Sequence, residues 1–298
     1  MMRGATERRQ PFLPYLAVGV GVVAISFSAI FIRWAEAPPA VIAFYRMLFS
    51  TLMLMPVALL RYRRDLTGLG WKGLAAGILA GLLLAAHFYA FITSLSYTSV
   101  ASSVVLVTAQ PLFVALGAYL LYGERLPRDS IPGVILALMG ALLIGVGDLA
   151  LSWAHGLGDL LAIGGAVLLA GYFLIGKGLR RHLEVVPYTF MVYGTCTLAL
   201  FLLVVLTGGP LYPYPRATWG LFLLMAVVPT ILGHTLFNWA IGYLPVMVVS
   251  MAFLLEPVGS GFLAWVLLGE ELIWTGWLGG IAVLGGLYWF MRRSRWGN

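Results

Sequence analysis

The segment Pro257–Leu272, PVGSGFLAWVLLGEEL, repeats the pattern of Pro111–Leu126, PLFVALGAYLLYGERL. Each begins with a proline that is followed twelve residues later by Gly-Glu, and the two prolines are 146 residues apart. Apolar segments often resemble one another by chance, but a proline and a Gly-Glu pair in the same order do not easily do so. The two segments therefore indicate that the chain contains two related halves.

Further matches lie on both sides of this pair. Offsets of 145 to 147 residues relate Leu16 to Leu161, His87 to His234, Gly133 to Gly279 and Gly140 to Gly286. The two histidines are 147 residues apart, so a one-residue slip lies between the halves at that point. We expect the first half to cover residues 1–150 and the second to cover residues 151–298.

The composition decides the class of protein. Of the 298 residues, 61% are hydrophobic and 10% are charged, and the mean hydropathy is +0.97. A soluble domain carries about 25% charged residues, so this chain has too few charges to cover a water-facing surface. The single cysteine, Cys196, excludes an internal disulfide. The composition predicts an integral membrane protein.

A membrane-spanning helix needs roughly 20 mostly apolar residues. Ten runs meet this requirement, and they lack the polar–apolar alternation of spanning β-strands. The predicted spans are 14–33, 38–60, 71–95, 100–122, 130–149, 158–178, 187–207, 217–241, 245–268 and 272–291. Each half therefore contains five helices. Because five is an odd number, the second half enters the membrane from the opposite side. We predict an all-α polytopic membrane protein with ten transmembrane helices arranged as two inverted five-helix repeats, a plan common in secondary transporters with midplane substrate sites.

The basic residues predict the orientation, because cytoplasmic loops carry an excess of Lys and Arg. With the N-terminus inside, the cytoplasmic segments hold 15 of the 18 basic residues: Arg3, Arg8, Arg9, Arg61, Arg63, Arg64, Lys72, Arg125, Arg128, Lys177, Arg180, Arg181, Arg292, Arg293 and Arg295. Arg33 and Arg216 fall outside, and Arg46 falls within a span. This distribution favours membrane topology over nucleic-acid binding, despite a pI near 9.7. We expect both termini to be cytoplasmic, in a bacterial inner (plasma) membrane.

Several stretches resemble the EamA-type ten-helix carriers of the drug/metabolite transporter superfamily. They are VIAFYRMLFSTLMLMP from Val41, GDLLAIGGAVLLAGYFLIGKGLRR from Gly158, and the two Pro-x11-Gly-Glu segments with the glycine-rich helices that follow them. The resemblance covers nearly the whole chain and is specific for the superfamily rather than for a substrate. It implies export of amino acids or other small metabolites by alternating access. It also implies that helices one, three, four, six, eight and nine line a central cavity, that two and seven flank it, and that five and ten lie outside.

Polar residues interrupt helix eight in the stretch His234–Gly242, HTLFNWAIG. Thr230, His234 and Asn238 are spaced four apart, so in an α-helix they form one polar stripe. Such a stripe faces a water-filled cavity or hydrogen-bonds a neighbouring helix, and both alternatives stay open. The first half places His87 in helix three, with Phe91 one turn later. Two inverted histidines would face each other across a pseudo-twofold axis.

A carboxyl group lies deep in helix nine. Glu256 is 11 residues after Pro245, about 16 Å along the helix and thus about half-way through a core of ~30 Å. Its counterpart is Gln110, and both residues precede a proline that bends the helix and frees the carbonyl four residues back. Free carbonyls beside a carboxylate suit an amine or a proton. The alternative is a neutral carboxyl that supports the bend.

Three more positions have two interpretations each. Arg46 in helix two is either a structural anchor or a contact for an anion or carboxylate. Tyr172 in helix six suits an aromatic or apolar substrate, although aromatic packing is the simpler interpretation. Asp159 is predicted to cap helix six. The candidate substrate-binding residues are His87, Phe91, Gln110, Tyr172, His234, Asn238 and Glu256.

The sequence has no Walker A motif, no HExxH, CxxC or His-rich metal motif, and no GxSxG elbow. We therefore expect no cofactor, no metal and no catalytic residues. The favoured function is a secondary carrier with a small-molecule substrate, in contact with membrane lipid, with proton coupling as an option and no nucleic-acid partner. The alternatives are a passive channel or a lipid scramblase and, less favoured, a membrane-embedded enzyme.

Overall fold

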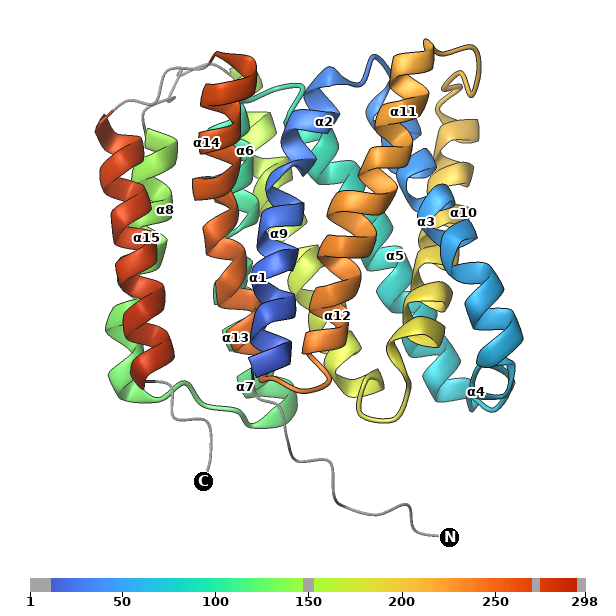
Figure 1. Cartoon of the computed structure of the whole chain (residues 1–298), viewed down its shortest axis with the longest axis horizontal. Helices are drawn as coiled ribbons and strands as arrows, with labels where there is room; N and C mark the ends of the chain where they lie inside the picture. The colour runs from blue at the N-terminus through green and yellow to red at the C-terminus, as the bar shows by residue number, and fades with distance from the viewer. Residues whose placement is uncertain (1–11, 147–152, 270–273, 294–298) are drawn as a thin grey trace, which may run out of the picture.

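The structure is a computed structural model that describes residues 12–146, 153–269 and 274–293. Within these ranges every regular element is helical and no strand occurs. The helices stand side by side in a bundle (Figure 1). Large apolar side chains cover the outside of the bundle as well as its core, which suits lipid as the surrounding solvent. The chain is an integral membrane protein.

The helices follow one another with short connections. In chain order they are α1 (Phe12–Ser26), α2 (Ser28–Trp34), α3 (Pro39–Arg61), α4 (Arg63–Thr67), α5 (Trp71–Ser94), α6 (Val100–Val107), α7 (Gln110–Tyr122), the 3-10 turn η1 (Arg128–Ser130), α8 (Ile131–Val146), α9 (Trp153–Leu179), α10 (Val185–Leu206), α11 (Arg216–Met225), the π-helix η2 (Ala226–Thr235), α12 (Leu236–Ala240), α13 (Val246–Ala252), the 3-10 turn η3 (Phe253–Leu255), α14 (Glu256–Leu268) and α15 (Trp274–Arg293).

Eight helical segments of the described chain are long and apolar enough to cross a membrane. They are Phe12–Trp34, Pro39–Arg61, Trp71–Ser94, Val100–Tyr122, Gly156–Leu179, Val185–Leu206, Arg216–Ala240 and Val246–Leu268. Each overlaps one predicted span. The other two predicted spans coincide with α8, which has 16 described residues, and with α15, which is less apolar.

The fourth and ninth predicted helices are interrupted at equivalent points. α6 ends at Val107 and α7 begins at Gln110, while η3 separates α13 from α14, which begins at Glu256. In both cases a proline is the second residue of the new helix and cannot donate to the turn before it. Both new helices then end at a glycine with positive φ, Gly123 at +67° and Gly269 at +71°. The left-handed conformation explains why the repeated Gly-Glu motif contains glycine.

Helix eight differs from the expected regular α-helix. Residues 226–235 form the π-helix η2, whose carbonyls bond to residues five rather than four positions later. The hydroxyls of Thr230 and Thr235 donate to the carbonyls of Met225 and Thr230, each five residues back, at 2.9 and 3.2 Å. Pro229 lies inside this segment and has no N–H to continue an α-helical ladder. The expected regular α-helical spacing of Thr230, His234 and Asn238 is therefore wrong, although all three residues are buried.

Close glycine contacts join α8 to α15. A Cβ at Gly133 would lie 2.7 Å from the carbonyl oxygen of Gly286, and a Cβ at Gly140 would lie 2.7 Å from that of Gly279. The two helices run antiparallel, since the earlier glycine of one meets the later glycine of the other. Backbone contact at these distances is possible only without side chains.

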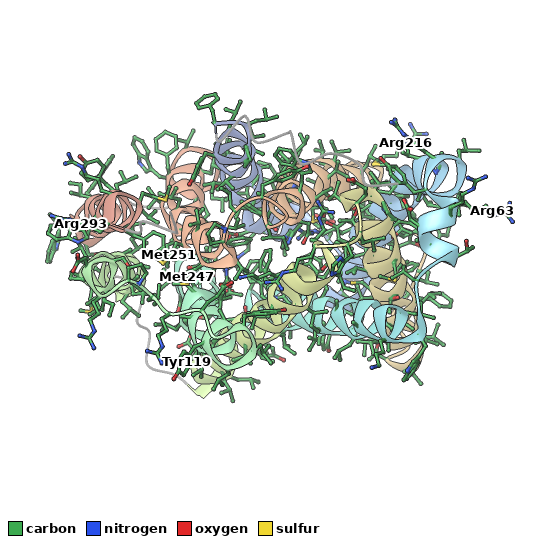
Figure 2. All side chains as sticks on the ribbon, turned by 90° about the horizontal axis from the view of Figure 1, so that it is seen from below. Arg63, Tyr119, Arg216, Met247, Met251 and Arg293 are labelled. Atoms are coloured by element: carbon green, nitrogen blue, oxygen red, sulfur yellow. The ribbon has the colours of Figure 1, made fainter. Side chains whose placement is uncertain are left out.

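The ends of the bundle are formed by two different helix pairs. α8 and α15 lie together at one end of the long axis, and α3 and α10 lie together at the other (Figure 1). Seen from below, Arg293 and Arg63 mark these two ends, whereas Met247 and Met251 lie in the interior (Figure 2). Both methionines are almost fully buried. α1 begins and α15 ends at the same edge of the bundle (Figure 1).

Candidate functional site

A small cavity lies between helices of both halves. Its volume, taken as the space open to the centre of a water molecule, is about 20 Å³, which is enough for roughly one water molecule. Its walls are formed by Ile25, Ser28, Arg46, His87, Phe88, Phe91, Val107, Thr108, Leu169, His234, Phe253 and Glu256. These residues come from predicted helices one, two, three, four, six, eight and nine. The family resemblance implies all of these helices except helix two, which contributes Arg46 to the wall.

Arg46 is held in place by hydroxyl groups from two other helices. Its Nε donates to Thr230 Oγ1 at 2.8 Å and its Nη1 donates to Ser28 Oγ at 3.0 Å. The Thr230 hydroxyl itself donates to Met225, so it offers a lone pair to the guanidinium. The guanidinium also lies over the ring of Phe88, with Cζ 4.2 Å from the ring centroid. Although the side chain is only 1% exposed, Nη2 has no hydrogen-bond partner among the described residues.

The two histidines predicted to face each other do lie close together. Their ring centroids are 6.4 Å apart, and the ring of Phe88 is 5.2 Å from that of His234. His87 Nδ1 lies 2.9 Å from the Gly165 carbonyl oxygen, which only accepts, so Nδ1 carries the hydrogen. His234 Nδ1 is buried and has no partner in the described part of the chain. One histidine is thus fixed by helix six, and the other retains an unused ring nitrogen.

Glu256 begins α14 and contributes to the cavity wall. Its side chain is 6% exposed. Within the described ranges neither Glu256 nor Arg46 forms an ion pair, although both line the same space. A carboxyl at the first turn of a helix is favoured by the helix dipole. The site therefore combines one basic and one acidic side chain that are not directly joined.

Three of the predicted site residues lie outside the cavity wall. Asn238 Nδ2 donates to the hydroxyl of Tyr172, which joins helix eight to helix six. Gln110 Nε2 donates to the Ser250 carbonyl at 3.4 Å, which joins helix four to helix nine. The geometry of these three residues is that of hydrogen bonding between helices. His87, Phe91, His234 and Glu256 line the cavity.

Polar contacts join three segments of the chain near the end of α2. Arg33 Nη2 donates to the Thr98 carbonyl at 3.2 Å, and the hydroxyls of Thr98 and Ser102 donate to Asp159 Oδ1 at 3.2 and 2.9 Å. Asp159 was predicted to be a helix cap, but α9 already begins at Trp153. The aspartate instead joins helix six to helix four.

A second set of contacts lies where α9 ends. Lys177 Nζ forms an ion pair with Glu124 Oε1. Arg180 Nε donates to the Asn238 carbonyl at 3.0 Å, and its Nη1 donates to the Leu183 carbonyl. Burial lowers the pKa of the Arg180 guanidinium. These contacts tie the end of α9 to the helices around it.

Arg46 and Ser28 belong to the cavity wall but were absent from the candidate set. The signal for Arg46 was present, since an arginine deep in an apolar span needs a partner or a cavity. The signal for Ser28 was weaker, because a serine within a helix commonly bonds its own backbone. Both side chains reach the cavity wall through contacts between helices, and the spacing of residues in the sequence does not reveal such contacts.

The chain is similar to several proteins named as transporters and to a solved structure. It is 29% identical to an uncharacterized transporter of Archaeoglobus fulgidus over 282 residues, which is 92% of this chain and 94% of the relative. It is 26% identical to the pseudopaline exporter CntI of Pseudomonas aeruginosa over 240 residues, 78% of this chain and 79% of the relative. A solved crystal structure at 18% identity covers 97% of this chain and 100% of its own, with a TM-score of 0.76, which extends the likeness to the fold. The sequence profile of the EamA-like transporter family matches residues 13–146 and 156–292, and the chain therefore belongs to that family.

Proposed function

We propose that the protein is a secondary carrier that exports small organic metabolites, amino acids or related compounds, by alternating access around the central cavity. The observation that carries this proposal is the small cavity between the halves, whose wall includes ionisable side chains. It contains Arg46, Glu256 and two histidines, groups that are costly to keep in a membrane without a role. At about 20 Å³ the cavity holds no metabolite, so binding requires the surrounding helices to separate. The polar contacts near the ends of α2 and α9, which can break one set at a time, suit such a cycle.

The proposal includes ten transmembrane helices in two inverted halves, residues 1–150 and 151–298. The α8–α15 glycine contacts support it. On the 146-residue offset Gly133 corresponds to Gly279 and Gly140 to Gly286. Exchange of the two halves therefore converts the Gly133–Gly286 contact into the Gly279–Gly140 contact. Contacts that interchange in this way are what a twofold axis between equivalent antiparallel helices produces.

Contacts between counterparts give independent support. Thr51 Oγ1 lies 3.0 Å from Thr197 Oγ1, and the two residues are 146 positions apart. The rings of His87 and His234, 147 positions apart, also neighbour each other. A residue can lie beside its own counterpart only if it lies near the symmetry axis. The axis that we propose thus passes between α8 and α15, between the histidines and between α3 and α10.

The remaining parts of the proposal concern the binding residues, direction and energy. His87, Phe91, His234 and Glu256 would contact substrate directly, whereas Gln110, Tyr172 and Asn238 would support the cavity walls. Export is proposed from the likeness to the pseudopaline exporter. Proton coupling would use the Glu256 carboxyl, because a carboxylate without a partner at this depth is costly and favours uptake of a proton.

Counterflow in proteoliposomes tests the carrier mechanism. Vesicles with purified protein are loaded with one unlabelled metabolite and diluted into a trace of the same labelled compound, across a panel of amino acids and other small metabolites. A carrier accumulates label transiently above equilibrium for at least one compound. A channel or a scramblase gives only equilibration or lipid exchange, and either result without counterflow would reject the proposal.

A further inference from the structure

The buried guanidinium of Arg46 is only partly hydrogen-bonded by the protein. Nε and Nη1 have partners, whereas Nη2 has none in the described part of the chain, and no carboxylate lies within ion-pair distance. An arginine presents its donors in a planar fork that matches the two oxygens of a carboxylate. The cost of a buried cation is offset when it meets such an anion. Nη2 is therefore an unpaired donor on a side chain that lines the cavity.

We propose that Arg46 binds the carboxylate of the transported compound, so that the site selects carboxylate-bearing metabolites over their neutral or purely cationic analogues. This inference rests on the proposed carrier function and specifies its substrate class. Ser28 and Thr230 fix the guanidinium from helices one and eight, and Phe88 covers its face. The carboxylate then occupies the cavity side, next to Nη2.

The rest of the cavity is consistent with a substrate that carries an apolar part and a second charge. Phe91, Phe253 and Leu169 provide apolar walls. Glu256 provides an acceptor for an ammonium group on the same molecule. A compound with a carboxylate and an amine would thus compensate Arg46 and Glu256 together.

Matched acid and amide probes test the inference. L-Phenylalanine, L-leucine and L-methionine are compared with their C-terminal amides, which keep the ammonium group and the side chain but lose the anion. Binding is measured as thermal stabilisation of the purified full-length protein in detergent, and transport as counterflow in proteoliposomes. For the wild-type protein we expect the acids to bind about ten- to a hundredfold more tightly than the amides, which is the range for hydrogen bonds to a charged group.

Arg46→Gln should abolish this preference, and Arg46→Lys, which keeps the charge without the fork, should retain part of it. Arg216→Gln makes the same change at an exposed arginine outside the site and should leave the preference intact. If both Arg46 variants lose binding of acids and amides equally, the inference is overturned. Arg46 would then interact with Glu256 rather than with the carboxylate of the substrate. Wild-type protein that binds acids and amides equally would overturn it as well.

The two readouts separate this inference from the carrier proposal. Acid-selective binding that depends on Arg46, without counterflow, would support the inference and reject the carrier. Counterflow of amides at the rate of acids would keep the carrier and reject the inference. Absence of both binding and counterflow for every acid in the panel would reject both.

Discussion

Two neighbouring glycines in α15 should respond in opposite ways to the same substitution. A Cβ on Gly286 would lie 2.4 Å from the Ala137 backbone nitrogen and 2.6 Å from the Gly133 carbonyl oxygen. A Cβ on Gly285 would meet only the side chain of Leu136, at 3.8 Å. Carbon atoms pack best at about 3.5–4.0 Å, so Gly286→Ala must push α8 and α15 apart by about 1 Å, whereas Gly285→Ala fits without movement.

The magnitude follows from two opposing contributions to the free energy of unfolding. Replacing a helical glycine by alanine stabilises a helix by about 0.5–1 kcal/mol, and both variants share this gain. Overpacking costs about 1–3 kcal/mol, and only Gly286→Ala incurs it, against backbone atoms that cannot rotate away. Gly285→Ala should thus be slightly stabilised, and Gly286→Ala should be less stable than it by about 1–3 kcal/mol.

Thermal unfolding in one detergent measures this difference directly. Tryptophan fluorescence is suited to it, because α15 carries Trp274, Trp277 and Trp289. With 2–4 °C per kcal/mol for a chain of this size, the two midpoints should differ by about 2–12 °C. Equal midpoints, or a higher midpoint for Gly286→Ala, would refute the close packing of the two helices.

Three further predictions concern orientation, the acidic residue and the ion pair at the end of α9. A cysteine near Arg180, in a background without Cys196, should react with a membrane-impermeant reagent only from the cytoplasmic side; labelling from outside the cell would reject the topology. Glu256→Gln should insert normally but lose most transport or most of its pH dependence, and a wild-type rate with a wild-type pH profile would make Glu256 a structural group. Glu124→Lys and Lys177→Glu should each destabilise the protein, and the double variant should recover about 1 kcal/mol in a double-mutant cycle; additive effects would mean that the ion pair contributes nothing.

The positions of the helices followed from the sequence because each depends on a local property. Apolar runs of sufficient length, short connections with turn residues and prolines at fixed positions determine where a membrane helix begins, bends and ends. The interruptions before Pro111 and Pro257 are examples, since a missing N–H acts within one turn. The left-handed glycines at the ends of α7 and α14 are another local effect.

The composition of the cavity wall was only partly predictable, because it depends on how helices are rotated about their axes. His87 and His234 could be paired in advance through the repeat. Asn238, by contrast, belongs to the same polar pattern as His234 but turns to Tyr172 in another helix. Arg46 was assigned two roles by sequence alone, and its hydroxyl partners lie 18 and 184 positions away in the chain. Contacts of that kind follow from the packed structure rather than from spacing.

The one-residue slip between the histidines has a physical explanation in η2. On the proposed repeat the offset is 146 at Thr51 and Thr197, and it becomes 147 at His87 and His234. The second half therefore contains one extra residue before His234, and the π-helix lies immediately there, over 226–235. A π-turn holds more residues per turn than an α-turn, so it absorbs the extra residue without moving the helix that follows. α5, its counterpart in the first half, is α-helical throughout. Without the π-helix an extra residue would rotate His234 by about 100° about the axis, away from His87. The irregular backbone in helix eight thus allows the two histidines to meet at the cavity despite the extra residue, and the offset is again 146 at Pro111 and Pro257.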